Sequence, residues 1–430
     1  MRRLGLALLA LGAVSAGCDW RDFDSLKNDA PVLAIEPPSG WPSSTDFASL
    51  MIATSPPSDG SAAARFVTSA TFQPAVSVVT LTAGGSASAQ MLASPALDVL
   101  GGQPVRALAA LPGTDQILLG LPAGTQGGTV LTADLSQSPP AVAKLAGVSS
   151  VLAAEQDLGI GLAAGNLDAQ SGTDLVVVSG VAVHAFLNGA SSDVSAGDSA
   201  ACPLEVVASV PGEEQIQRAV VVGPLMGATS AIAVGTPGAR APGHVSLFAL
   251  DSTGALTCLF SLSSPQTDAF GEQFGLSLAI GDFNGDGQAD LLVGSPPDRA
   301  YLYKGPISAG AAPALTFANS MSAGYSGAAV AALDVDGKPG DEALIGDPDG
   351  AGDTNQPGAG DAVVVSGSLD VIRPLSDPRG ASGHAYGSSV AALPFCASLP
   401  CPSPVRLPLV GAANKAFVYF NLSGSDPRTR

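Results

Sequence analysis

The segment from Asp282 to Asp290 carries the clearest chemistry in the chain. Oxygen-bearing side chains stand at its positions 1, 3, 5 and 9, which are Asp282, Asn284, Asp286 and Asp290. Gly287 at position 6 permits a sharp turn, and the main-chain carbonyl of Gln288 offers a further oxygen. Aspartates this close repel one another unless a cation neutralises them. The spacing therefore predicts a Ca²⁺-binding loop rather than an ordinary turn rich in Asp and Gly.

Two other segments repeat this spacing with losses. The first keeps its oxygens but has fewer carboxylates, with Asn166, Asp168, Gln170 and Asp174 at the four positions. The second contains Asp334, Asp336 and Glu342 but places the ammonium group of Lys338 at position 5. We expect both to bind Ca²⁺ more weakly than the first loop, and the sequence leaves open whether they bind it at all.

The residues around these loops recur along the chain. Each unit has a short apolar run, such as Leu291–Ser295, followed by a second run, such as Ala300–Tyr303. Runs of this kind bounded by Gly, Pro or Asp are typical of β-strands. Seven copies recur at about 60 residues, anchored at Thr54, Gly120, Val178, Gly235, Gly294, Gly346 and Gly411. This predicts an all-β fold, a seven-bladed β-propeller spanning residues 31–430 with about 60 residues per blade.

The two ends of the repeat array are expected to meet. Complete units leave room for a fourth, outer strand, whereas the last unit ends soon after Phe420. The run Pro31–Glu36 precedes the first unit and has no partner there. An unpaired outer edge invites association with other chains. We therefore predict that this N-terminal strand pairs with the seventh blade and closes the ring.

The amino-acid composition argues against several classes of protein and of binding partner. The chain is 46% hydrophobic and 13% charged, which excludes a disordered chain, and its 52 Gly and 34 Pro argue against long helices. The net charge of −19 makes nucleic acid and bare anionic membrane poor partners. The stretch Ala219–Ala239 is uncharged, but Pro224 and Pro237 interrupt it and the repeat register assigns two strands to it. We therefore reject a membrane span there.

Phe274–Gly275, the Asp-rich loop and Val293–Pro296 together resemble an FG-GAP repeat, the repeat of the integrin alpha-subunit propeller and its bacterial relatives. The seven copies match the seven blades of that family. The resemblance implies that the Ca²⁺ loop is structural and ties two strands of a blade. It also implies a binding or adhesion scaffold whose partner, a protein or an envelope polysaccharide, docks on the propeller loops.

The N-terminus resembles a bacterial lipoprotein signal. Met1–Arg3 is basic, Leu4–Gly17 is uncharged and Cys18 follows. This predicts a signal peptide at 1–17, a lipid on Cys18 and an acidic linker at 18–30. The protein would then be exported to the bacterial cell envelope and touch the membrane through that lipid alone, on either the inner or the outer membrane. The alternative is ordinary cleavage after Ala16, which leaves a free thiol.

The other four cysteines form an even set, which suits an oxidising compartment. Cys396 and Cys401 lie where the loop of the last unit belongs, so we expect a local disulfide to tie the strands there. Cys202 and Cys258 follow the third strands of consecutive units, and by elimination we expect them to pair.

No residue is nominated as catalytic. The histidines His184, His244 and His384 lack zinc-ligand spacing, and neither a nucleophile elbow nor a phosphate loop is found. The sequence therefore favours a non-enzymatic scaffold. The alternative is an envelope enzyme of hydrolase type with its site at the propeller channel.

Overall fold

The structure is a computed structural model, and it describes most of the predicted propeller. The described residues are 32–42, 47–70, 73–92, 103–123, 127–148, 152–168, 170–189, 193–204, 218–238, 243–266, 272–318, 324–351, 358–379, 383–396 and 404–420. The signal peptide at 1–17, Cys18, the linker to residue 30 and Cys401 lie outside these ranges.

The described strands form seven antiparallel sheets of four strands each. Blade 1 contains β2 (Leu50–Ala53), β3 (Ala64–Ser69), β4 (Val76–Leu81) and β5 (Ala87–Met91), and blade 2 contains β6 (Ala107–Ala110), β7 (Gln116–Pro122), β8 (Gly128–Asp134) and β9 (Ala141–Lys144). Blade 3 contains β10 (Gly161–Gly165), β11 (Asp174–Val178), β12 (Ala182–Phe186) and β13 (Val194–Gly197), and blade 4 contains β14 (Val220–Met226), β15 (Thr229–Thr236), β16 (His244–Leu250) and β17 (Leu256–Ser263). Blade 5 contains β18 (Ser277–Gly281), β19 (Asp290–Ser295), β20 (Arg299–Tyr303) and β21 (Leu315–Ala318), and blade 6 contains β22 (Ala329–Leu333), β23 (Glu342–Asp347), β24 (Asp361–Val365) and β25 (Val371–Ser376). Blade 7 contains β26 (Ser389–Phe395), β27 (Val405–Ala412), β28 (Lys415–Tyr419) and β1 (Val32–Ile35), and two short 3₁₀ turns occur at η2 (Leu152–Ala154) and η3 (Leu187–Gly189).

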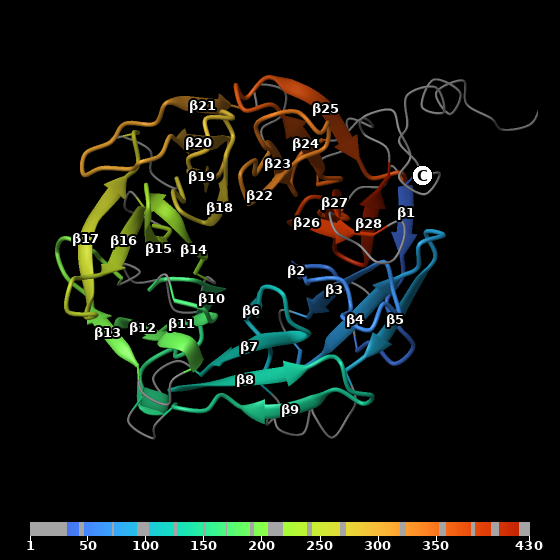
Figure 1. Ribbon diagram of the computed structural model, residues 1–430. Coiled ribbons are helices and arrows are strands. Elements are labelled where there is room, and N and C mark those ends of the chain that lie inside the picture. Colours follow the sequence, from blue (N-terminus) through green and yellow to red (C-terminus); the bar gives the residue numbers. More distant parts are fainter. Residues whose placement is uncertain are drawn as a thin grey trace, which may run out of the picture.

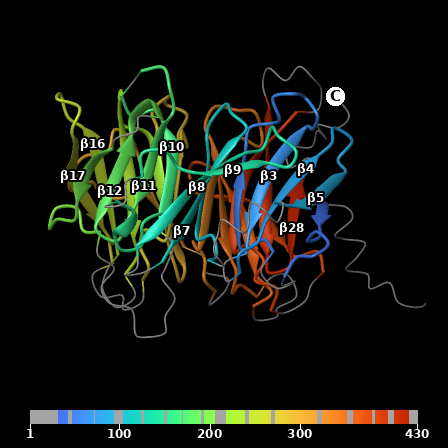
Figure 2. The same cartoon turned by 90° about the horizontal axis from the view of Figure 1, so that it is seen from below.

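The sheets stand around a central axis as the blades of a propeller (Figure 1), and the side view shows them as a ring of upright sheets (Figure 2). The first strand of each blade lies nearest the axis and contacts the first strands of both neighbours, from β2 to β26 and back to β2. The hydrophobic core lies between blades, with one buried cluster for each adjacent pair. The seven-bladed prediction is confirmed.

Glycines allow neighbouring blades to approach one another closely. A Cβ on Gly294 would lie 2.1 Å from the carbonyl oxygen of Gly327 in the next blade, and Gly327 itself has a φ of +90°. Gly120, Gly235, Gly346 and Gly411 meet the following blade in the same way. The repeated glycines are therefore required by packing as well as by turns.

The ring is closed as the sequence predicts. β1 pairs antiparallel with β28, and Val32 lies opposite Tyr419 while Ile35 lies opposite Ala416. Ile35 is buried in the core cluster that joins blade 7 to blade 1. The outer position of the last blade is thus filled by the N-terminal strand.

The anchor assigned to the first unit is wrong. The repeat register aligns Thr54 with Gly294 of the second strand β19, but Met51–Ala53 belongs to the innermost strand β2, and the second strand is β3. The register pairs Leu50 with Ser69 as it pairs Ser277 with Gly294, so Ser69 is the true counterpart of Gly294. The Thr-Ser-Pro sequence after β2 imitates the end of a second strand, which explains the error.

The uncharged stretch 219–239 contains β14 and β15, as predicted. No helix in the described part of the chain is long and apolar enough to cross a membrane.

Candidate metal centre

The candidate metal loops connect the innermost strand of a blade to its second strand. In blade 5 the loop runs from β18 to β19, and the antiparallel register pairs Gly281 with Asp290. In blade 6 it runs from β22 to β23, and Leu333 pairs with Glu342. The position-9 carboxylate is thus the first residue of the second strand in both blades, so the sheet holds it beneath the loop.

The blade 5 loop is folded around its own side chains. The carboxylate of Asp282 accepts hydrogen bonds from the backbone N–H groups of Asp286 and Gly287, at 3.0 and 2.8 Å. The side-chain oxygen of Asn284 also accepts from Asp286 N, and Asp286 accepts from Gln288 N, both at 2.8 Å. The loop therefore gathers its oxygen ligands over one tight turn, which is a donor set that fits a hard divalent cation.

Asp290 is fully buried and anchors this loop. Its two oxygens accept hydrogen bonds from Phe283 N at 3.1 Å and from Gly305 N at 2.8 Å, so it joins the loop to the turn after β20. Burial raises the pKa of the Asp290 carboxyl, and the nearby charges of Asp286 and Asp282 raise it further. A bound cation would offset this repulsion.

The blade 6 loop gathers its acids more closely. One carboxylate oxygen from each of Asp334, Asp336 and Glu342 lies within 4.8 Å of the others. Burial raises the pKa of Glu342, and the charges of Asp336 and Asp334 add to it. This cluster could hold a metal ion. From its sequence, the loop is expected to bind Ca²⁺ more weakly than the loop of blade 5.

Lys338, whose charge led us to expect weaker binding, is exposed and pairs with one acid of the cluster. Its side chain is 76% exposed, and its ammonium binds one carboxylate oxygen of Asp336. The other Asp336 oxygen accepts from Lys338 N. The exposed ammonium therefore already offsets part of the negative charge of the cluster through Asp336, and Ca²⁺ binding by this loop stays a prediction.

The two loops are joined across the blade boundary. Asp282 N donates to the Asp341 carboxylate at 3.0 Å, and Asp341 N donates to the Asp282 carbonyl at 2.7 Å. A cation in either loop would therefore stabilise the boundary between blades 5 and 6 as well as its own blade.

Side-chain amide groups form hydrogen bonds within the blade 3 loop. Asn166 donates its amide to the Gln170 carbonyl, and the Asn188 side chain donates to Asp168 at 2.9 Å. Asp174 takes the same anchoring role as Asp290, since it accepts from Asn188 N at 2.7 Å and from the loop backbone at 2.6 Å. Hydrogen bonds thus hold this loop, and weak Ca²⁺ binding by it stays a prediction.

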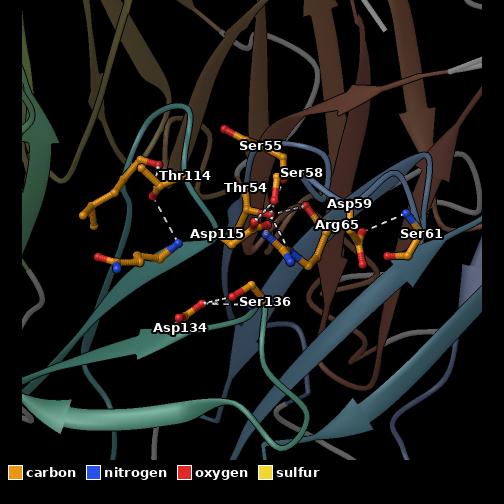
Figure 3. A network of polar contacts seen from close by, with 12 residues as sticks. Thr54, Ser55, Ser58, Asp59, Ser61, Arg65, Thr114, Asp115, Asp134 and Ser136 are labelled. Atoms are coloured by element: carbon orange, nitrogen blue, oxygen red, sulfur yellow. Dashed lines mark hydrogen bonds and ion pairs between the residues drawn. The ribbon is translucent and has the colours of Figure 1, made fainter. Parts of the chain in front are cut away.

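Blades 1 and 2 are joined by an ion pair that no sequence motif reveals. By the register given above, Arg65 of β3 stands where Asp290 stands in blade 5. Its guanidinium donates to the Asp115 carboxylate of blade 2 at 2.5 Å and to Thr54 Oγ1 at 3.2 Å (Figure 3). Ser58 donates to the other Asp115 oxygen. The positively charged guanidinium of Arg65 thus links blade 1 to the loop between β6 and β7 of blade 2.

Cysteines also link neighbouring parts of the ring. Cys202, after β13 of blade 3, forms a disulfide with Cys258 in β17 of blade 4. Cys396 is buried after β26, but its predicted partner Cys401 lies outside the described residues. The first pairing agrees with the prediction and the second stays a prediction.

Comparison with known proteins identifies the repeat. Residues 274–307 match the family model of the FG-GAP repeat, which places the match on blade 5 and its loop. Blade 5 therefore contains an FG-GAP repeat within a seven-bladed propeller. A search of curated proteins finds no match.

Solved structures with the same fold include two whose chains are covered almost completely. The crystal structure of the WD40 β-propeller domain of Doa1 has a TM-score of 0.52 and 10% identity over 91% of this chain and 96% of that chain. The crystal structure of the mitotic checkpoint complex contains a chain with a TM-score of 0.51 and 13% identity, over 91% and 92%. Identities this low show the propeller fold alone.

Proposed function

We propose that this chain is an exported, lipid-anchored propeller, stabilised by Ca²⁺, that acts as a non-enzymatic binding or adhesion scaffold at the bacterial cell envelope. The observation that carries the proposal is the pair of adjoining acidic loops in blades 5 and 6, the first of which lies within the FG-GAP match. Ca²⁺ would be held by Asp282, Asn284, Asp286, Asp290 and the Gln288 carbonyl in blade 5, and by the acid cluster in blade 6.

Two of the three histidines are held by carboxylates. His184 is buried, and its two ring nitrogens contact the carboxylates of Glu155 at 2.9 Å and Asp193 at 2.6 Å. Ser179 donates to Glu155 rather than to this histidine. His384 contacts the buried Asp377 carboxylate at 2.9 Å. These contacts join neighbouring loops. The third histidine, His244, contacts the Ser263 hydroxyl at 3.2 Å, and the two residues are a cross-strand pair of β16 and β17, the outer strands of blade 4. A hydrolase with its site at the channel remains the alternative.

Export and anchoring rest on the sequence of residues 1–18. The test compares the full chain with its Cys18→Ala variant in a bacterial host fed a clickable fatty acid. The proposal predicts lipid labelling and membrane association of the parent chain, and loss of both in the variant. Equal labelling of both chains, or labelling of neither, would contradict lipidation at Cys18.

The scaffold role is tested with envelope extract passed over the immobilised propeller. Capture that protease treatment abolishes identifies a protein partner, and capture that survives protease but not periodate identifies a polysaccharide. The enzyme alternative would instead be supported by turnover of an ester or glycoside substrate without stable capture.

A further inference from the structure

Blades 5 and 6 exchange two hydrogen bonds at the edge of the predicted Ca²⁺ loop. Asp282 N donates to a carboxylate oxygen of Asp341 at 3.0 Å, and Asp341 N donates to the Asp282 carbonyl at 2.7 Å. Asp341 belongs to the β22–β23 loop of blade 6 and lies 59 residues further along the chain. Both polar backbone groups of Asp282 are therefore bound by one residue of the neighbouring blade.

The backbone on both sides of the contact makes room for it. A Cβ on Gly281 would lie 2.7 Å from Asp341 Oδ2, so the Asp341 side chain fits because the residue before Asp282 is glycine. Gly340 has a φ of +102°, a conformation that favours glycine, and a Cβ there would lie 3.1 Å from the carbonyl oxygen of Phe283. These glycines let the segment before β23 lie directly against the blade 5 loop.

The Asp341 carboxylate is held mainly by the hydrogen bond from Asp282. Its side chain is 20% exposed, and the oxygen that does not bind Asp282 N is 4.0 Å from the Arg406 guanidinium of blade 7. Arg406 is 51% exposed, and an ion pair so long and so exposed adds little. The contact with Asp282 is thus the closest polar contact of this carboxylate among the described residues.

Asp282 stands at the first ligand position of the loop. Its carboxylate accepts hydrogen bonds from Asp286 N and Gly287 N, at 3.0 and 2.8 Å, while its backbone is bound by Asp341. A ligand that is already fixed costs less entropy to order when an ion binds. Groups that orient the ligands of a metal typically change its affinity by about 10- to 100-fold. Asp341 is therefore placed to affect Ca²⁺ binding without touching the ion.

The blade 3 loop faces a different neighbour. The register pairs Gly165 with Asp174 as it pairs Gly281 with Asp290, so the two glycines occupy equivalent positions. A Cβ on Gly165 would lie 2.7 Å from the side chain of Val222 in blade 4. The following blade thus presents an apolar side chain to the loop with fewer carboxylates, and a hydrogen-bonding carboxylate to the blade 5 loop.

We propose that Asp341 is a positioning residue for Ca²⁺ in the blade 5 loop. It holds the Asp282 backbone from the neighbouring blade and thereby sets the affinity of the loop for the ion. This role rests on the Ca²⁺ binding proposed above. It makes that affinity depend on a residue outside both the loop and the matched repeat at 274–307.

Ca²⁺ titration calorimetry of the purified full chain tests this role with two variants that both remove the Asp341 charge. Asp341→Asn keeps an oxygen that can accept from Asp282 N, whereas Asp341→Leu has a similar size and no acceptor. Asp341→Leu should bind Ca²⁺ about tenfold more weakly than Asp341→Asn. In an Asp286→Ala background, which removes a ligand of the blade 5 loop, the two substitutions should give equal Ca²⁺ affinities.

Two results would overturn the role of Asp341 while leaving Ca²⁺ binding by the parent chain intact. One is equal affinity of Asp341→Asn and Asp341→Leu, and the other is a difference that persists in the Asp286→Ala background. A parent chain that binds no Ca²⁺ would overturn both this role and the proposed Ca²⁺ stabilisation. Circular dichroism and the melting temperature in EDTA establish that each variant is folded.

A measurement on the parent chain decides the question if Asp341→Leu does not fold. The Asp341 amide donates to the Asp282 carbonyl, so Ca²⁺ in the blade 5 loop should slow its hydrogen exchange. Asp286→Ala should abolish this protection. An exchange rate of the Asp341 amide that does not respond to Ca²⁺ in the parent chain, or that responds equally in Asp286→Ala, would contradict the proposal.

Discussion

Arg65 of blade 1 occupies the strand position that Asp290 occupies in blade 5, and its guanidinium contacts the Asp115 carboxylate of blade 2 at 2.5 Å. The side chains of Arg65 and Asp115 are 4% and 10% exposed. At this end of the second strand, blade 5 has an acidic residue and a preceding loop rich in oxygen ligands. Blade 1 has a basic residue there and lacks such a loop. Both arrangements join the loops that connect the first and second strands.

Removing one partner of this pair should destabilise the protein. Arg65→Met or Asp115→Leu alone leaves a mostly buried charge without its partner, and we expect each to lower the free energy of unfolding by about 3 kcal/mol. The double variant should recover much of that loss, because both charges are then gone. Urea unfolding of the four proteins measures the coupling, and additive effects of the two single changes would refute the pair.

The pair should also make stability depend on acid pH. Burial tends to raise the pKa of Asp115, but hydrogen bonds from Ser58 and Arg65 outweigh it and hold that pKa below 3.8. A depressed carboxyl pKa contributes stability above the unfolded value, and this is lost as pH falls through the folded value. The stability difference between the parent chain and Asp115→Asn should therefore shrink below about pH 4. A difference that grows with acidification would contradict this assignment.

Ring closure predicts a local response at the last blade. Deleting residues 32–35 removes the partner of β28, so amide exchange around Phe417–Phe420 should become faster before other strands respond. The β16 amides of blade 4, far from the closure, serve as the internal control. Unchanged protection of β28, or equal loss of protection in β16, would show that β1 does not carry the closure.

The Cys202–Cys258 disulfide should stabilise the outer part of blades 3 and 4. The cysteines are 56 residues apart in sequence, and loss of a native bridge over such a loop costs about 2–5 kcal/mol. Cys258→Ser should lower the urea midpoint of the oxidised protein, and added reductant should then change that variant less than the parent chain. Equal midpoints of variant and parent without reductant would contradict a stabilising bridge.

Much of the fold could be predicted because each repeat contains the same kinds of strand in the same order. Strand-like runs and their glycines recur in order, and the unpartnered run at 31–36 predicted the closing strand. The first unit failed where Thr54 and its neighbours imitate the end of a second strand, although they belong to the loop after β2. The local sequence does not distinguish the end of a second strand from the start of this loop. The difference lies in the strand pairing, in which Leu50 of β2 pairs with Ser69 of β3.

The candidate site was predictable in its residues and less so in its contacts. The spacing of Asp282 to Asp290 identified the blade 5 loop. In blade 6 the close grouping of the three acids, and the pairing of the exposed Lys338 with Asp336, could not be judged from the sequence. Arg65 and Asp115 are 50 residues apart in sequence, and neither belongs to a motif. Their pairing follows from the alignment of neighbouring blades, which no single segment encodes.

The most direct test of the central claim is the melting temperature of the purified full chain with Ca²⁺ and with EDTA. A cation that binds the folded state alone stabilises it by about 2.7 kcal/mol at a hundredfold excess over Kd. We predict a lower melting temperature in EDTA and a smaller Ca²⁺ response in Asp286→Ala, whereas Asp251→Ala, in an exposed turn with similar hydrogen bonds, should respond like the parent chain. An identical melting temperature in Ca²⁺ and EDTA, with no metal in the purified protein, would contradict the account.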